Sequence, residues 1–350
     1  MVEAARSKRF RLWKGGTAGA STLPSTMRAE DNPGSAGASP AVSRAPRDTL
    51  GAIAEPDCGA GRPDVFGEAP KTAGEEPALP GGNSLLVWLN FVCLDAPIVA
   101  VSWAWLFARG FGIPIPAGEA GALFLTAWLI YLADRFGDSL SVDPRGPTSA
   151  RQRFCLRHRR AWTAVLLAVA AADLFVICIS LNTRECVAGT VIGLCAVIYL
   201  SVNQLLPKIW RVLPMKEFSI GLLFAAGTMV PLSASLTRAV PPIWFLFACL
   251  CAMNCICIAF WERALDAAQQ RISIATAFPR VARLVLPVLL LLCLTSVLFA
   301  VQPLFLCIAI SAGLLAVLHV FGERLAPDSR TALADLIMLS PLFILGSAHL

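Results

Sequence analysis

The sequence is poor in charged residues. Asp, Glu, Lys and Arg make up 15% of its 350 residues, whereas about 25% is usual for a soluble domain. Hydrophobic residues make up 57% of the chain, and its mean hydropathy is +0.68. This balance excludes an ordinary soluble domain and predicts an all-α, polytopic membrane protein.

The motifs of several common enzyme classes are also missing. The three histidines form no metal-ligand pattern, and the chain has no glycine-rich phosphate loop, dinucleotide-binding fingerprint or interpretable Ser-His-Asp arrangement. Twelve cysteines are present, but their spacing is not that of a zinc site. Most lie in or beside apolar stretches, where small residues pack well between membrane helices.

The first part of the chain, residues 1–83, has little that would build a core. It is crowded with Gly, Pro, Ala and Ser and shows no sustained helical or strand period, so we predict a disordered N-terminal tail. No apolar core of a secretory signal follows its basic start. The basic segment 6–14 is compatible with a solvated arm or with contact to anionic lipid.

From residue 84 onward the chain is dominated by apolar stretches. A membrane-spanning helix needs about 20 apolar residues, and nine stretches approach this length, so we predict one transmembrane domain over residues 84–350 with about nine helices in contact with a lipid bilayer. The stretches are 84–108, 117–133, 161–181, 186–206, 217–237, 242–261, 282–301, 302–320 and 332–349.

Loop charges predict the orientation of these spans. The connections after the second, fourth, sixth and eighth stretches carry sixteen Lys and Arg residues, and the opposite connections carry three. Because positive loops stay in the cytoplasm, we expect a multi-pass protein of the cell (inner) membrane with its N-terminus and acidic loops cytoplasmic. Since the net charge of +6 resides in these loops, we expect no nucleic-acid partner.

Acidic residues recur at two stretch ends on the cytoplasmic side. Asp134 and Asp138 are four residues apart, with Asp143 five residues further on, and Glu262 and Asp266 repeat the spacing. On a helix, residues four apart share one face, and two carboxylates there suit a hard cation such as Mg²⁺. The alternative for each pair is a solvated helix cap or a surface charge cluster.

Other polar residues lie near the same side of the membrane. Lys216 and Arg211 precede the fifth stretch and are suited to a diphosphate, although the positive-inside rule alone also explains them. Asn90, Asp95 and Asn254 lie within apolar stretches, where a polar residue either contacts substrate or bonds to a neighbouring helix.

Together these features resemble the UbiA superfamily of intramembrane prenyltransferases, over roughly residues 84–349. The family's first motif, Asn-Asp-x-x-Asp-x-x-x-Asp, corresponds to the segment 133–143, in which Ala133 replaces the Asn and each Asp spacing is one residue longer. The second motif, Asp-x-x-x-Asp, corresponds to Glu262 and Asp266.

The resemblance implies Mg²⁺-dependent transfer of an isoprenoid from its diphosphate to an aromatic or other lipophilic acceptor. In that scheme the acidic helix ends hold the metal, Lys216 or Arg211 stabilises the leaving oxygens, and an aromatic face such as that of Tyr131 shields the allylic cation. The alternative functions are a non-catalytic scaffold of the same fold and a membrane transporter. A transporter is favoured by broken helices that meet near the midplane.

Overall fold

The computed structural model describes residues 85–143, 146–236 and 242–342, and within these ranges every regular element is helical. The predicted all-α class is therefore confirmed for the described residues. The expected tail, 1–83, and the end of the expected ninth stretch, 343–349, lie outside them. The helices are α2 (Leu85–Phe91), α3 (Asp95–Phe111), α4 (Ala117–Leu140), α5 (Ala150–Arg157), α6 (Arg159–Ser180), α7 (Thr183–Leu205), α8 (Lys216–Thr228), α9 (Pro242–Trp261), α10 (Arg263–Ala268), α11 (Ile274–Ala277), α12 (Ala282–Val297), α13 (Pro303–Phe321) and α14 (Pro327–Ile337).

Five helical segments are long and apolar enough to cross a membrane. They are Arg159–Ser180, Thr183–Leu205, Pro242–Trp261, Pro279–Val297 and Pro303–Arg324. Each overlaps a stretch that the sequence predicts as a span. These segments give the chain the character of a helical membrane protein.

Several helix boundaries differ from the expected stretches for local reasons. The first stretch is interrupted at Cys93, whose φ of 60° lies in the left-handed region, so that α2 and α3 are separate helices. The fifth stretch ends early because a 3₁₀ turn containing Pro231 follows α8. The last described helix, α14, begins at Pro327, which precedes the expected stretch 332–349. Proline is favoured at the first positions of a helix.

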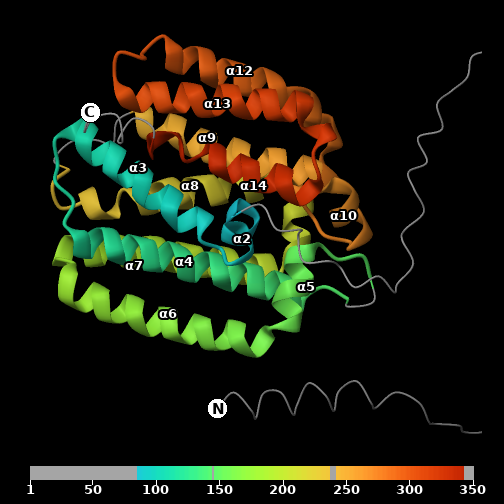
Figure 1. Cartoon of the computed structure of the whole chain (residues 1–350), viewed down its shortest axis with the longest axis horizontal. Helices are drawn as coiled ribbons and strands as arrows, with labels where there is room; N and C mark the ends of the chain where they lie inside the picture. The colour runs from blue at the N-terminus through green and yellow to red at the C-terminus, as the bar shows by residue number, and fades with distance from the viewer. Residues whose placement is uncertain (1–84, 144–145, 237–241, 343–350) are drawn as a thin grey trace, which may run out of the picture. The chain divides into compact units, whose positions relative to one another are not determined.

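The helices pack as a layered bundle (Figure 1). The pair α12 and α13 lies along one edge and α6 along the other, where α4 packs against α6 and α7 packs against α8 and α4. Between these edges lie α3, α8, α9 and α14. The short helices α5 and α10 both lie at one end of the bundle, which is the end where α4 and α9 finish.

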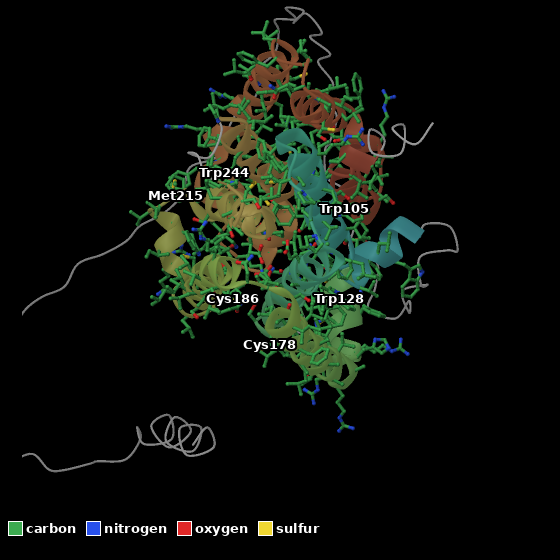
Figure 2. The ribbon with its side chains drawn as sticks, turned by 90° about the vertical axis from the view of Figure 1, so that its left-hand side faces the viewer. Trp105, Trp128, Cys178, Cys186, Met215 and Trp244 are labelled. Carbon is green, nitrogen blue, oxygen red and sulfur yellow. The ribbon has the colours of Figure 1, made fainter. Side chains whose placement is uncertain are left out.

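Indole rings connect neighbouring helices inside the bundle. The Trp103 ring donates a hydrogen bond to the Met338 carbonyl at 2.8 Å and stacks on Phe247, with ring centroids 4.2 Å apart. Trp128 and Trp244, labelled in Figure 2, donate to backbone carbonyls of Val92 and Ala225 at 3.0 and 2.8 Å. These bonds satisfy polar atoms in an environment that otherwise lacks partners for them.

The outer surface of the bundle is rich in exposed apolar side chains. Leu167 and Phe175 on α6 are 68% and 66% exposed. Trp105 and Met215 are also exposed, and Met215 lies at the edge of the bundle in Figure 2. A soluble monomer rarely exposes so large an apolar surface, so these faces suit contact with lipid.

Candidate functional site

A cavity of about 770 Å³ lies inside the bundle. It is lined by residues of α2, α3, α4, α6, α7, α8, α9 and α14, together with residues of α5 and α10 at the end of the bundle. Nine of the eleven site residues predicted from the sequence line this cavity: Asn90, Asp95, Tyr131, Asp134, Asp138, Lys216, Asn254, Glu262 and Asp266. Arg211 and Asp143 are exposed and do not line it.

The first acidic pair lies on one continuous helix. α4 continues through Leu140, so that Asp134 and Asp138 share a face as the spacing predicts. The Asp138 carboxylate pairs with Arg271, whose Nη1 is 3.0 Å from Oδ2. Arg271 also donates to the Asp138 carbonyl at 2.8 Å. This ion pair joins the end of α4 to the segment that follows α10.

The second acidic pair lies at the turn between α9 and α10. Glu262 precedes α10, and the Asp266 amide donates to the Glu262 carbonyl at 2.9 Å, so the helical spacing of the two carboxylates is kept. Glu262 pairs with Arg151 of α5. Burial raises the pKa of Asp266 to about 6, although a hydrogen bond with the Ser273 side chain acts in the opposite direction. A cation at this carboxylate would stabilise its ionised form.

Three arginines in the cavity were not singled out by the sequence, where the positive-inside rule accounted for them. Arg135, Arg151 and Arg271 line the cavity with Lys216. The Nε atoms of Arg135 and Arg151 are buried and have no hydrogen-bond partner among the described residues. The Arg135 guanidinium also lies over the Tyr131 ring, 4.8 Å from its centroid, so one face of this ring already has a cation. The two unpartnered donors are suited to an anion.

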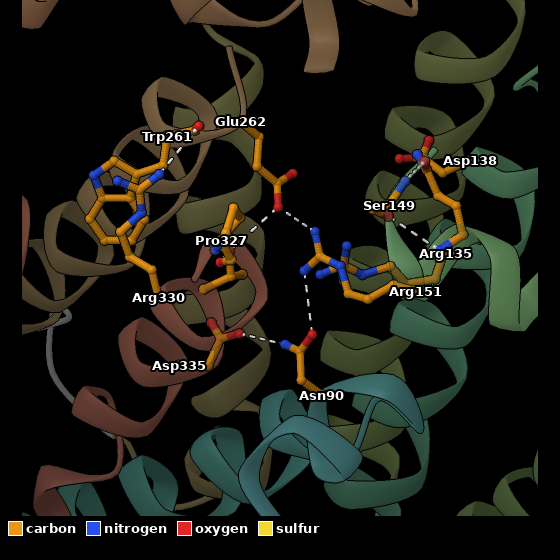
Figure 3. Close-up of polar contacts among 12 residues, drawn as sticks. Asn90, Arg135, Asp138, Ser149, Arg151, Trp261, Glu262, Pro327, Arg330 and Asp335 are labelled. Carbon is orange, nitrogen blue, oxygen red and sulfur yellow. Dashed lines mark hydrogen bonds and ion pairs between the residues drawn. The ribbon is translucent and has the colours of Figure 1, made fainter. Parts of the chain in front are cut away.

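A buried polar cluster connects the first and last helices at this cavity (Figure 3). The Asn90 amide donates to Asp95 at 2.7 Å and to Asp335 at 2.9 Å, and Asn254 donates to Asp335 at 3.2 Å. The Asn90 oxygen accepts a hydrogen bond from Arg151 at 3.3 Å. Figure 3 shows this chain from Asp335 through Asn90 and Arg151 to Glu262.

Asp335 is the residue of this cluster that the sequence reasoning missed. It is an acidic residue inside the apolar stretch 332–349, which is the same signal that pointed to Asp95. The bond between Asn90 and Asp95 was also unforeseen. Residues five apart on a continuous helix are separated by about 140° around its axis, since each residue turns it by about 100°. The break at Cys93 brings the two side chains together.

The rest of the cavity is largely apolar. Val99 of α3, Ile130 of α4, and Leu223 and Phe224 of α8 line it. Polar residues interrupt this part of the wall at Glu119, at Thr190, and at Thr126, which donates to Asp173 of α6 at 2.9 Å. The cavity therefore combines a charged end with an apolar space that suits a hydrocarbon chain.

The acidic residues do not form a metal site by themselves. Among the described residues, no three His, Cys, Asp or Glu side chains group closely enough to hold an ion. Comparisons with protein families, curated proteins and solved structures found no match to this chain. The function therefore has to be argued from the cavity.

Proposed function

We propose that the protein is an integral-membrane, Mg²⁺-dependent prenyltransferase of the UbiA type, which moves an isoprenoid from its diphosphate to an aromatic or other lipophilic acceptor. One observation carries this proposal. Both acidic pairs and four cations line the charged end of a single cavity whose other walls are mainly apolar. A polar head attached to a long hydrocarbon tail requires this combination.

The balance of charge supports a role for divalent cations. Nine carboxyl groups and four cationic side chains line the cavity among the described residues. A bare diphosphate would be repelled by this excess of carboxylates. Mg²⁺ is usually bound by one or two carboxylates together with substrate phosphates, so the lack of a three-residue cluster is compatible with an ion shared with a diphosphate.

The donor set fits this metal, because carboxylate oxygens are its preferred protein ligands. We propose that Asp134, Asp138, Glu262 and Asp266 would hold it, whereas Asp143 remains a prediction from the sequence. When bound, the metal would neutralise the charge that develops on the leaving diphosphate.

The cations of the cavity have their own role in this scheme. Lys216 at the start of α8 and the unpartnered Nε–H groups of Arg135 and Arg151 can donate to diphosphate oxygens. These fixed donors stabilise the leaving group as its bond to the allylic carbon breaks. Arg211 is exposed outside the cavity, so we propose that Arg135 and Arg151, rather than Arg211, donate to the diphosphate oxygens.

The apolar walls complete the proposal. The isoprenoid would lie against Ile130, Leu223 and Phe224, and the free face of Tyr131 or the ring of Tyr199 would shield the allylic cation. We further propose that α3, α4, α8 and α14 also cross the bilayer, giving nine spans in the cell (inner) membrane with the charged end cytoplasmic.

Transport remains a second candidate because of one observation. The first stretch is broken between α2 and α3, and this break is lined by the polar residues Asn90 and Asp95. Broken helices with polar residues at the break are typical of transporters. A non-catalytic scaffold would keep the same bundle without turnover.

The test is binding of allylic diphosphates of several chain lengths to the purified protein, with Mg²⁺ or with chelator. The parent should bind at least one of them only with Mg²⁺. Asp134→Asn, Asp138→Asn and Asp266→Asn should each weaken this binding about tenfold or more, because each removes a charged ligand while keeping its size. Lys216→Ala should weaken it and keep the Mg²⁺ dependence.

Glu323→Gln is the matched control, since Glu323 is exposed outside the cavity and loses the same charge. It should bind like the parent. Equal binding in chelator, or no binding over the whole panel, would refute the prenyltransferase proposal. Movement of an intact ligand across a vesicle membrane without turnover would favour transport.

A further inference from the structure

A second group of polar and aromatic side chains lies outside the cavity, where α9, α13 and α14 pack together. Trp261 ends α9, His319 lies in the last turn of α13, and Arg330 lies in the first turn of α14. The Arg330 guanidinium lies over the Trp261 ring, 5.0 Å from its centroid, as Figure 3 shows. The His319 and Trp261 rings are stacked with their centroids 6.4 Å apart. We call these three residues the Arg330 cluster.

The Arg330 side chain is positioned by packing rather than by an acidic partner. A Cβ atom placed on Gly322 would lie 2.9 Å from Arg330 Cδ, so the stem of the arginine crosses this glycine closely. Its Nη2 donates to the Trp261 carbonyl at 3.4 Å, which is a long hydrogen bond. Glu262 at the same end of α9 is already paired with Arg151, and within the described ranges no carboxylate forms an ion pair with Arg330. The cation is therefore fixed in place without being neutralised.

Two buried nitrogen atoms of the Arg330 cluster also lack partners. They are Nε of Arg330 and Nδ1 of His319, and neither has a hydrogen bond to any residue that the structure describes. Leaving buried polar groups unpaired is costly. A guanidinium only donates hydrogen bonds, and a histidine nitrogen donates in the appropriate tautomer. The ligand that suits this cluster is an anion with several acceptor oxygens, and phosphate matches the planar fork of an arginine.

The cluster lies at one end of an apolar helical segment. Gly322 falls in the last turn of Pro303–Arg324, which is long and apolar enough to cross a membrane. Phe321 and Leu325, which flank this glycine in the chain, are 62% and 41% exposed. Tryptophan is enriched at the interface between membrane and water, and basic pockets between membrane helices bind the head groups of anionic lipids. An anionic site and an exposed apolar surface are thus found together.

We propose that Arg330, His319 and Trp261 form a binding site for the phosphate group of an anionic phospholipid. The guanidinium donates to the phosphate oxygens, and the acyl chains lie against the exposed apolar side chains of α13. Soluble phosphate offers the same oxygens but leaves the apolar surface uncovered, so the lipid fits both parts. This site is separate from the cavity and does not depend on what the cavity binds.

The test is lipid binding by the purified full chain in a neutral detergent, measured by native mass spectrometry. Phosphatidylglycerol and phosphatidylcholine are the probes. The parent should prefer phosphatidylglycerol by about tenfold, since charge-assisted hydrogen bonds from arginine to phosphate are strong and a choline group brings a second cation. Arg330→Gln should remove most of this preference, and His319→Ala should reduce it several-fold. Arg330→Lys keeps the charge without the planar fork, so its preference should lie between those of the parent and Arg330→Gln.

Arg324→Gln is the matched control. Arg324 is exposed at the same end of α13, and its side chain has no hydrogen bond or ion pair in the part of the chain that the structure describes. This variant loses one positive charge, as Arg330→Gln does, and should keep the parent's preference. The affinity of each variant for phosphatidylcholine is the internal control for folding, because a general loss of native protein lowers both affinities equally.

Three results would overturn the proposal. Equal affinities of the parent for the two lipids would mean that the cluster does not select an anion. An equal loss of preference in Arg324→Gln and Arg330→Gln would mean that overall surface charge, rather than the cluster, attracts the lipid. Displacement of bound phosphatidylglycerol by inorganic phosphate at the same concentration would make soluble phosphate the ligand instead of the lipid.

Discussion

Arg151 is the residue on which the polar network of the cavity depends most directly. Its side chain is 9% exposed, and it joins Glu262 of the second acidic pair to Asn90 of the buried cluster. A buried ion pair adds little net stability, but removing one partner leaves an unpaired buried charge. Removing one partner of the pair should therefore destabilise the protein more than removing both partners.

Substituting Arg151→Met should lower the free energy of unfolding by about 3 kcal/mol, because Glu262 then loses its partner. The double variant Arg151→Met with Glu262→Gln should be more stable than the sum of the single effects predicts. Chemical unfolding of all four proteins in detergent measures this coupling.

Arg157→Met is the control on the same helix, since Arg157 is exposed. It should change stability by no more than about 0.5 kcal/mol. Additive effects of the two single substitutions would show that the ion pair does not couple α5 to the turn between α9 and α10.

In the cavity wall, the backbones of α8 and α9 lie in close contact at Gly221. A Cβ atom placed on Gly221 would lie 2.6 Å from the Ala252 nitrogen and 2.8 Å from the Ala248 carbonyl oxygen. Both contacts are with backbone atoms, which cannot turn away. Small residues at such crossings allow membrane helices to approach closely.

Gly221→Ala should therefore destabilise the protein by about 1–3 kcal/mol, because the two helices have to separate. Gly227→Ala on the same helix should be neutral or slightly stabilising, since no atom lies within 4 Å of a Cβ there and alanine is the better helix former. Unfolding midpoints of the two variants measure the difference. Equal shifts of the two midpoints would mean that the close contact of Gly221 with α9 does not decide the outcome.

The sequence predicted helical elements better than their interruptions. The spacing of Asp134 and Asp138 depended only on α4 remaining helical, and the helix continues through both. The separation of α2 from α3 depends on the backbone of Cys93, a residue with no special preference for the left-handed region. The contact of Asn90 with Asp335 joins residues 245 positions apart, which one sequence read for local pattern does not predict.

At the scale of the whole molecule, several polar contacts between distant segments lie at one end of the bundle. Gln152 of α5 and Gln269 after α10 exchange hydrogen bonds, and Arg271 bonds to Asp138 at the end of α4. The loop charges had assigned all of these segments to the same side of the membrane. Their contacts in the structure place these segments together at one end of the bundle.

Orientation follows from fusions that end the chain at different loops. A reporter fused after Gly146 should be in the cytoplasm, and one fused after Leu181 should be on the opposite side, because sixteen basic residues lie on the first side and three on the second. Paired reporters that are active on only one side of the membrane measure this. The reverse pattern would place the proposed diphosphate site outside the cell and refute the orientation.

The bond between Asn90 and Asp335 also has a consequence for the order in which the molecule is made. Asn90 is synthesised with the first described helix and Asp335 with the last. Until the final helix leaves the ribosome and inserts, the Asn90 amide has only Asp95 as its carboxylate partner, and one wall of the cavity is absent. The side of the chamber lined by Asp335 and Met338 is thus completed only after the rest of its lining has been synthesised, and a chain stopped before residue 335 contains both acidic pairs without these two residues.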